Sequence, residues 1–225
     1  MAAGRLIVLE GSEGAGKTTQ LRLLASLLEQ QGRSILTLRE PGGTPLGDSI
    51  RTILLDSPGD MAPAAEALLF MASRAEIMAR HVDPALDAGV IVLMDRFFLS
   101  TYAYQIGGRG LDEANVRAAN QLATGGRRPD LNLVIDVPAA EGLVRAAARG
   151  SHDRIERSGD EFHARVSKAF AEFASEDWQK AHEECGKIVR VDGSGLPDEV
   201  HRRIVKTLAQ NLPQEFGMLD QVTAR

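Results

Sequence analysis

The chain has 225 residues, of which 44% are apolar and 25% charged, and its formal net charge is −5. This length and composition fit one α/β domain that buries an ordinary core without a membrane. No apolar run approaches the roughly 18 residues that a bilayer span needs, and the acidic balance argues weakly against nonspecific binding of nucleic acid.

The signals of cellular location point to the cytoplasm. Cys185 is the only cysteine, so an internal disulfide is excluded and a reducing compartment is the natural interpretation. The apolar stretch before Glu10 is too short and too soon interrupted for a secretory signal. We therefore predict a cytoplasmic protein with no membrane partner and no nucleic-acid partner.

Apolar runs alternate with helical patterns along the chain. The residues from Val90 to Met94 are all apolar, as expected of a parallel strand covered on both faces. Gly32 and Gly89 lie where helix C-terminal caps belong, and Asp112 lies where an N-cap belongs. The predicted strands are 5–10, 34–39, 90–95, 131–137 and 187–191. The predicted helices are 16–31, 45–55, 64–80, 99–106, 112–124, 138–149, 160–182 and 198–211. This order predicts an α/β fold, a doubly wound five-stranded parallel sheet with helices on both faces and ligands outside the carboxyl ends of the strands.

A glycine-rich loop lies between the first predicted strand and the first predicted helix. Residues 11–18 match the pattern GxxxxGK[ST], and strand, loop and helix in that order are the context that a P-loop needs. Backbone N–H groups of such a loop surround phosphate, and the helix N-terminus adds partial positive charge. Lys17 can reach the terminal phosphates, and the Thr18 hydroxyl can bind Mg²⁺. The predicted nucleotide-binding residues are Gly11, Ser12, Glu13, Gly14, Ala15, Gly16, Lys17, Thr18 and Thr19. A glycine-rich turn without a ligand is the alternative.

The strand predicted over 90–95 ends in an acid followed by an arginine. After a buried strand, in a chain that already has a phosphate loop, Asp95 is a candidate for binding Mg²⁺ directly or through water. Arg96 would point a guanidinium into the ligand crevice, where it matches the geometry of phosphate. A surface salt bridge is the alternative for Arg96.

Two further segments carry charge or glycine toward the same edge of the sheet. Residues 39–44 read Arg-Glu-Pro-Gly-Gly-Thr, a turn that Pro41 stiffens and whose glycines permit a close backbone approach to a ligand. After the fourth predicted strand, four arginines lie within residues 143–157, interrupted by Gly150 and Ser151. We interpret residues 149–157 as a lid segment that supplies charge to a transferring phosphate. A solvated helix face is the alternative.

Over about residues 5–205 the sequence resembles the thymidylate kinase family. The phosphate loop and the pair Asp95-Arg96 occur in many nucleotide kinases. The turn at 39–44 and the run Ser-Thr-Tyr-Ala-Tyr-Gln at 100–105 are more particular to this family. The resemblance implies a P-loop NTPase fold and the reaction ATP + dTMP → ADP + dTDP with Mg²⁺. The expected partners are therefore ATP and dTMP, and the expected metal ligands are Thr18 and Asp95.

The resemblance also implies a role for each residue around dTMP. Arg39 and Arg96 would bind the 5′-phosphate, with Arg51 as an addition, and Glu13 would approach the sugar 3′-hydroxyl. Phe70 would stack on the thymine, while Arg74 and Gln105 would hydrogen-bond it. Tyr104 would pack on the deoxyribose, and the loop 192–195 would face adenine. The implied dTMP site is Glu13, Arg39, Pro41, Arg51, Phe70, Arg74, Arg96, Thr101, Tyr104 and Gln105. The implied catalytic residues are Lys17, Arg96, Arg149 and Arg154, with the charge-stabilising arginine in the lid segment as in the bacterial branch.

Some interpretations stay open on the sequence alone. From its apolar surroundings Phe70 is a core residue, and only the resemblance makes it a base contact. Phe97 stands where relatives often carry Tyr or His, so a role for that position is in doubt. A kinase for another phosphorylated acceptor is the first rival function, and a nucleotide-dependent switch or assembly module is the second. The predicted domain is 1–212 with a loosely ordered tail at 213–225, and the family implies a homodimer through helices near 64–80 and 99–124.

Overall fold

The computed structural model describes residues 4–138, 141–142, 144–145 and 153–219. At its centre lies a parallel sheet with the strand order β2-β3-β1-β4-β5. The strands are β1 (Arg5–Glu10), β2 (Ile35–Arg39), β3 (Ile91–Asp95), β4 (Leu131–Asp136) and β5 (Ile188–Asp192). Each lies within one residue of the predicted bounds, and the parallel, doubly wound sheet is confirmed.

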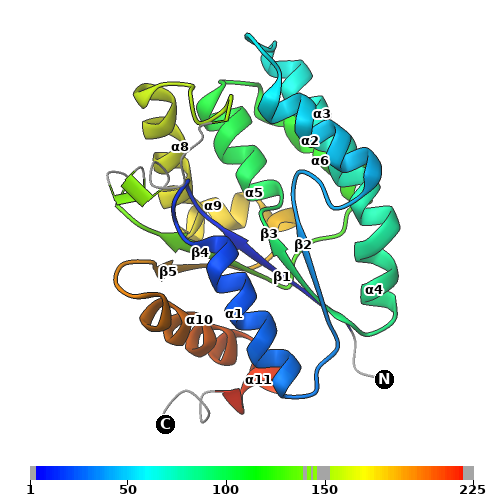
Figure 1. Ribbon diagram of the computed structural model, residues 1–225, viewed down its shortest axis with the longest axis vertical. Helices are drawn as coiled ribbons and strands as arrows, with labels where there is room; N and C mark the ends of the chain where they lie inside the picture. Colours follow the sequence, from blue (N-terminus) through cyan, green and yellow to red (C-terminus); the bar gives the residue numbers. More distant parts are fainter. Residues whose placement is uncertain (1–3, 139–140, 143, 146–152, 220–225) are drawn as a thin grey trace.

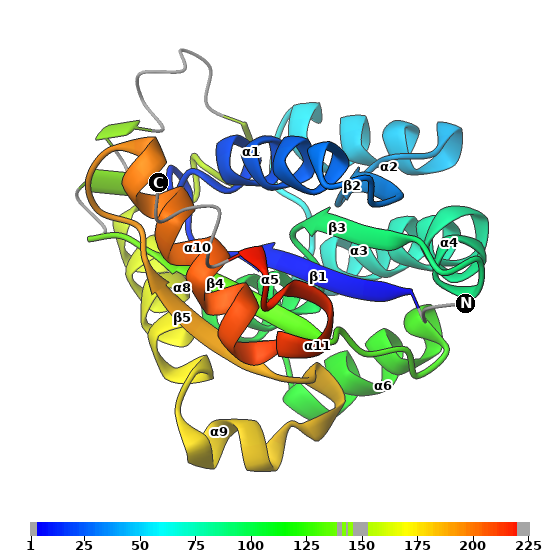
Figure 2. The ribbon, with the colours of Figure 1, turned by 90° about the horizontal axis from the view of Figure 1, so that it is seen from below.

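Helices cover both faces of the sheet (Figures 1 and 2). Alternating side chains of each strand pack into two separate hydrophobic clusters, one under each helical layer. One face packs on α1 (Lys17–Gln30), α10 (Pro197–Asn211) and α11 (Pro213–Phe216). The other packs on α3 (Pro63–Ile77), α5 (Phe98–Thr101), α6 (Glu113–Thr124) and α8 (Asp160–Phe173). Leu6 and Val8 of β1 face the second layer, whereas Ile7 and Leu9 face the first. The central strand is therefore apolar on both sides, as buried parallel strands are.

The predicted caps are present. The backbone at Gly32 and Gly89 has a positive φ of 71° and 78°, and the Asp112 side chain accepts a hydrogen bond from Asn115 N at the start of α6. Thr44 caps α2 (Pro45–Asp56) by accepting from Gly47 N. These short-range signals explain why the helix starts and ends follow the sequence closely.

Two predicted helices contain π-helical turns that the sequence pattern did not reveal. The helix predicted over 64–80 continues through η1 (Met78–Val82) into α4 (Asp83–Asp87), and Asp83 N donates to Met78 O, five residues back. Pro84, in the first turn of α4, has no N–H and cannot donate the regular helical hydrogen bond. The π-helical turn lies directly before this interruption. The helix predicted over 99–106 is α5 followed by η2 (Tyr102–Gly108).

Two other predictions were wrong in their bounds. The helix predicted over 160–182 ends at Phe173, because Ser175 caps a separate α9 (Glu176–Ala181), which a short η3 (Glu183–Cys185) follows. The segment from 213 was expected to be loosely ordered, yet up to residue 219 it is packed, since Phe216 and Leu219 are 1% and 5% exposed in the core. Most of the helix predicted over 138–149 lies outside the described residues.

Within the part of the chain that the structure describes, no helix combines the length and the apolar content that crossing a membrane requires. The carboxyl ends of β1, β3 and β4 meet at one edge of the sheet, where the phosphate loop and the pair Asp95-Arg96 follow their strands. This edge positions the candidate site.

Candidate active site

The phosphate loop (residues 11–18) turns tightly between β1 and α1. Gly11, Gly14 and Gly16 have φ values of 140°, 71° and 90°, and a Cβ at Gly11 would lie 2.4 Å from the carbonyl oxygen of Ile135. Only glycine fits this path. The loop therefore follows the tight backbone path that the motif predicts.

Lys17 bends back over the phosphate loop. It is 7% exposed, and its Nζ donates to the carbonyl oxygens of Gly11 at 3.0 Å and Ser12 at 2.8 Å. Burial, followed by the nearby charge of Arg96, lowers the pKa of Lys17 to about 8. An anion bound in the loop would favour the charged form of Lys17 and raise its pKa again.

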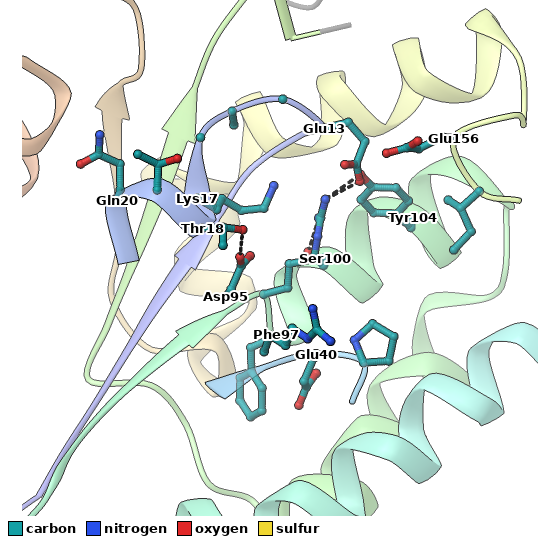
Figure 3. Close-up of a pocket in the computed structure, with 18 of the residues that line it drawn as sticks. Glu13, Lys17, Thr18, Gln20, Glu40, Asp95, Phe97, Ser100, Tyr104 and Glu156 are labelled. Atoms are coloured by element: carbon teal, nitrogen blue, oxygen red, sulfur yellow. Dashed lines mark hydrogen bonds and ion pairs between the residues drawn. The ribbon is translucent and has the colours of Figure 1, made fainter. Parts of the chain in front are cut away.

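Thr18 and Asp95 meet from neighbouring elements. The Thr18 Oγ1 donates to Asp95 Oδ2 at 2.5 Å across the edge of the sheet (Figure 3). Among the described residues there is no group of three or more His, Cys, Asp or Glu side chains placed to bind a metal. A hydroxyl and one carboxylate are nevertheless a suitable donor set for Mg²⁺, which takes its remaining ligands from substrate phosphates and water.

Arg96 lies at the centre of the site in a strained backbone conformation. Its φ of 72° falls in the left-handed region that a non-glycine residue rarely adopts. Its Nη1 donates to Gly11 O at 3.2 Å and to Ser100 Oγ at 2.9 Å, and its Nη2 pairs with Glu13 at 2.5 Å. Burial by itself lowers the pKa of Arg96, but Glu13 and the other acids around it outweigh burial and raise it. The guanidinium is therefore permanently charged at the mouth of the phosphate loop.

Glu10 holds this conformation, a role that its place in the sequence did not predict. The Glu10 carboxylate is fully buried and accepts from Phe97 N at 2.8 Å, Ser100 N at 3.2 Å and Ser100 Oγ at 2.6 Å. Burial raises its pKa despite these bonds. Glu10 thereby anchors the segment that directly follows Arg96. The available signal was an acid at the end of an otherwise apolar strand.

A second buried network positions Arg74. Its Nε and Nη2 donate to Glu40 Oε2 at 2.8 and 2.6 Å, and its Nη1 donates to Thr101 Oγ1 at 3.0 Å and Asn120 Oδ1 at 2.8 Å. The Arg74 guanidinium also lies over the ring of Phe97, 5.1 Å from its centroid. Glu40 and Asn120 were missed because their partners are distant in sequence. Phe97 is fully buried, so the role of this position, which the sequence left open, is packing in the core.

These groups surround one cavity of about 710 Å³. Its lining contains most of the predicted site: Glu13, Gly14, Ala15, Gly16, Lys17, Thr18, Thr19, Arg39, Pro41, Arg51, Phe70, Arg74, Asp95, Arg96, Thr101, Tyr104 and Gln105. Gly193, Gly195, Pro197 and Val200 line it as well, from the loop after β5 and from α10. The cavity thus extends from the loop after β5, past the phosphate loop, to the residues predicted to surround a thymine.

Individual predicted residues differ in how the structure places them. Phe70 is half-buried, packs against the core and also lines the cavity, and its contact with a base stays a prediction. Arg39 is exposed at the cavity rim, and Arg51 donates to the carbonyl oxygen of Pro41 at 3.0 Å. Glu13 also accepts from the Tyr104 hydroxyl at 3.0 Å, and Figure 3 shows these two side chains facing one another.

The lid segment (residues 149–157) is described only from residue 153. Asp153, Ile155 and Glu156 line the cavity, but Arg154 does not. Its guanidinium is buried between Leu54 O, at 2.8 Å, and the carboxylate of Glu66, at 2.8 Å. Arg149 lies outside the described residues. The structure therefore does not bring Arg154 to the phosphate position.

Comparisons with known proteins found similar sequences and a similar fold. A family model described as thymidylate kinase matches residues 9–204. A thymidylate kinase of Thermosynechococcus vestitus is 44% identical, over 97% of this chain and 92% of its own. A thymidylate kinase of Pseudomonas putida is 48% identical over 77% of this chain and 84% of its own. The crystal structure of thymidylate kinase from Ehrlichia chaffeensis superposes with a TM-score of 0.70 at 30% identity, covering 92% of this chain and 99% of that one.

Proposed function

Since the chain belongs to the thymidylate kinase family and phosphorylates dTMP to dTDP, we propose how its own residues divide that reaction. The observation that carries the proposal is one continuous cavity, lined by the loop after β5, by the phosphate loop, and by Phe70 and Gln105. ATP occupies the side toward β5, and dTMP occupies the side toward Phe70 and Gln105. The two nucleotides then lie end to end over Lys17 and Arg96.

The donor side supplies charge and backbone donors to the ATP phosphates. When ATP binds, the Lys17 ammonium exchanges the carbonyl oxygens of Gly11 and Ser12 for phosphate oxygens. Thr18 and Asp95, which meet in a hydrogen bond, would hold Mg²⁺, and the metal would supply positive charge to the ATP phosphates. The loop at Gly193 and Gly195 lines the cavity where adenine is expected.

The acceptor side fixes the dTMP phosphate in line with the donor. Arg96, Arg39 and Arg51 all line the cavity, and the charges of Arg39 and Arg96 act on Arg51. Their guanidinium groups match a phosphate dianion. A phosphomonoester is already largely ionised at pH 7, because its second pKa is ~6. The attacking oxygen therefore needs no general base, and positioning and electrostatic stabilisation provide the rate.

The roles of Arg149 and Arg154 remain predictions. Arg154 would have to leave Glu66 and Leu54 to reach a phosphate, a change that lid closure around two nucleotides would supply. A closed lid segment would also exclude water and suppress ATP hydrolysis.

We also propose that the protein forms a homodimer through α3 and α6. Leu68 on α3 and Leu122 on α6 are 62% and 86% exposed, and exposed apolar side chains of this size favour burial against a partner. Light scattering on the purified protein measures the mass directly. A cytoplasmic location stays a prediction that rests on the single cysteine.

The proposal is tested by the choice of acceptor. Coupled detection of ADP release from Mg·ATP should be carried out with dTMP, dUMP, AMP, CMP, UMP and GMP side by side. We expect dTMP to have the highest kcat/KM. A preference for another monophosphate would favour the rival kinase, and slow hydrolysis that no monophosphate changes would favour a nucleotide switch.

A further inference from the structure

Glu66 on α3 is a fully buried carboxylate that three side chains surround. Its Oε1 accepts from Gln105 Nε2 and from Arg109 Nε, each at 3.0 Å. Its Oε2 accepts from Arg109 Nη2 at 3.0 Å and pairs with Arg154 Nη2 at 2.8 Å. Burial raises the pKa of Glu66, but the hydrogen bonds from Arg109, Gln105 and Arg154 outweigh burial and lower it below its usual range. Glu66 is therefore an anion at neutral pH.

An anionic Glu66 determines which way the Gln105 carboxamide points. A carboxylate only accepts hydrogen bonds, so the nitrogen of the amide, and not its oxygen, must face Glu66. Gln105 is 1% exposed and lines the cavity. Its Oε1, the other end of the amide, has no hydrogen-bond donor among the described residues. This oxygen is not completely buried, so a ligand can reach it. The carboxamide thus offers the cavity an acceptor.

We propose that Glu66 is a positioning residue for acceptor specificity, which selects a pyrimidine with an N–H at ring position 3 by fixing the Gln105 oxygen toward the cavity. This inference rests on the proposed dTMP site. Thymine and uracil carry a hydrogen on N3 and can donate to Gln105 Oε1. Cytosine has an unprotonated N3, so two acceptors would face each other in a buried site and both would lose a partner.

A purely structural role for Glu66 predicts something different. Glu66 also joins Arg109 and Arg154, so its loss would loosen the wall of the cavity for every nucleotide. Loosening lowers kcat/KM for all acceptors together. Only control of the Gln105 amide changes the ratio between bases that differ at N3 and preserves the ratio between bases that share N3–H.

The test compares kcat/KM for dTMP, dUMP and dCMP in the full-length wild type and in Glu66→Gln. The new carboxamide has a donor of its own, so it no longer dictates the orientation of Gln105. We expect the dTMP:dCMP ratio to fall by roughly tenfold or more, the value of about one hydrogen bond, and the dTMP:dUMP ratio to stay within about twofold. Arg109→Gln is the matched control, because it removes a neighbour of Glu66 and leaves the Glu66–Gln105 bond in place. It should preserve both ratios.

The possible outcomes separate the two claims. A wild type that does not phosphorylate dTMP overturns the proposed function and this inference with it. An active wild type whose dTMP:dCMP ratio survives Glu66→Gln, or falls equally in Arg109→Gln, overturns this inference alone.

A second measurement needs only the wild-type fold, in case Glu66→Gln does not fold. The side-chain amide protons of Gln105 are assigned in an ¹⁵N spectrum by their loss in Gln105→Leu. Bonded to a buried carboxylate, they should exchange with solvent at least tenfold more slowly than the amide of the exposed Gln30. Equal exchange rates would overturn the inference.

Discussion

Raising the pH above about 8 should weaken ATP binding, because Lys17 loses its proton in the nucleotide-free site. Its ammonium is buried beside Arg96, and these two influences lower its pKa to about 8. Phosphates of bound ATP would restore a normal or raised pKa, since an opposite charge favours the ionised form. ATP binding should therefore weaken as the pH rises. Below pH 8 the free site carries the ammonium that ATP needs, and above pH 8 binding must take up a proton.

The expected size follows from that proton uptake. If ATP binds only to the ammonium form, the apparent Kd is proportional to 1 + 10^(pH − pKa). With the Lys17 pKa at about 8, the Kd should rise by ~25-fold, or ~2 kcal/mol, between pH 7.5 and 9.5. The ATP phosphates themselves are fully ionised over most of this range, because a terminal phosphate has its last pKa at ~6.

Isothermal titration with Mg·ATP in the absence of dTMP measures this dependence, and Lys17→Arg is the control. Arginine stays protonated at every pH used, so its Kd should be flat across the same range even if it is weaker throughout. A wild-type Kd that is the same at pH 7.5 and 9.5 would refute the reasoning, since Lys17 would then be fully charged in the empty site.

Three other changes have expected outcomes. Arg149→Ala or Arg154→Ala should lower kcat by ~10³-fold with little change in dTMP binding, and steady-state kinetics with equal kcat and a raised KM would contradict a catalytic role. Glu10→Gln should reduce the free energy of unfolding by ~1–3 kcal/mol, because the buried Ser100 and Phe97 donors lose a charged acceptor. An unchanged urea midpoint would count against it. Ser175→Ala removes the cap of α9 and should cost ~1 kcal/mol in thermal unfolding without changing dTMP kinetics, because α9 does not line the cavity.

The fold was predictable because its signals are local. Each strand is a short apolar run, and the helix ends at Gly32 and Asp112 involve hydrogen bonds to neighbours within a few residues. The phosphate loop is recognisable from its sequence alone, because its glycines and their spacing determine its backbone path. Such features need no knowledge of distant contacts, which is why the sheet and most helix ends were predicted within one or two residues.

The buried acids were not predictable, because the contacts that bury them are not local in the sequence. Glu10, Glu40 and Glu66 look like surface residues in the sequence, and each is buried by partners 34 to 90 positions away. The π-helical turn at Tyr102–Gly108 also has no period of its own, yet it carries Tyr104 and Gln105 into the cavity. Side-chain pairing between distant elements, rather than pattern, determines these parts of the site.

At Arg96, stability and activity favour different residues: the left-handed backbone favours glycine, whereas the reaction needs the guanidinium. A glycine there would adopt the same φ without the cost of roughly 1 kcal/mol or more that a side chain incurs. It would also delete the guanidinium that reaches Gly11, Glu13 and Ser100. A screen that rewarded heat resistance alone would therefore enrich an inactive enzyme at this position, so thermostable libraries of this protein need a turnover selection run in parallel.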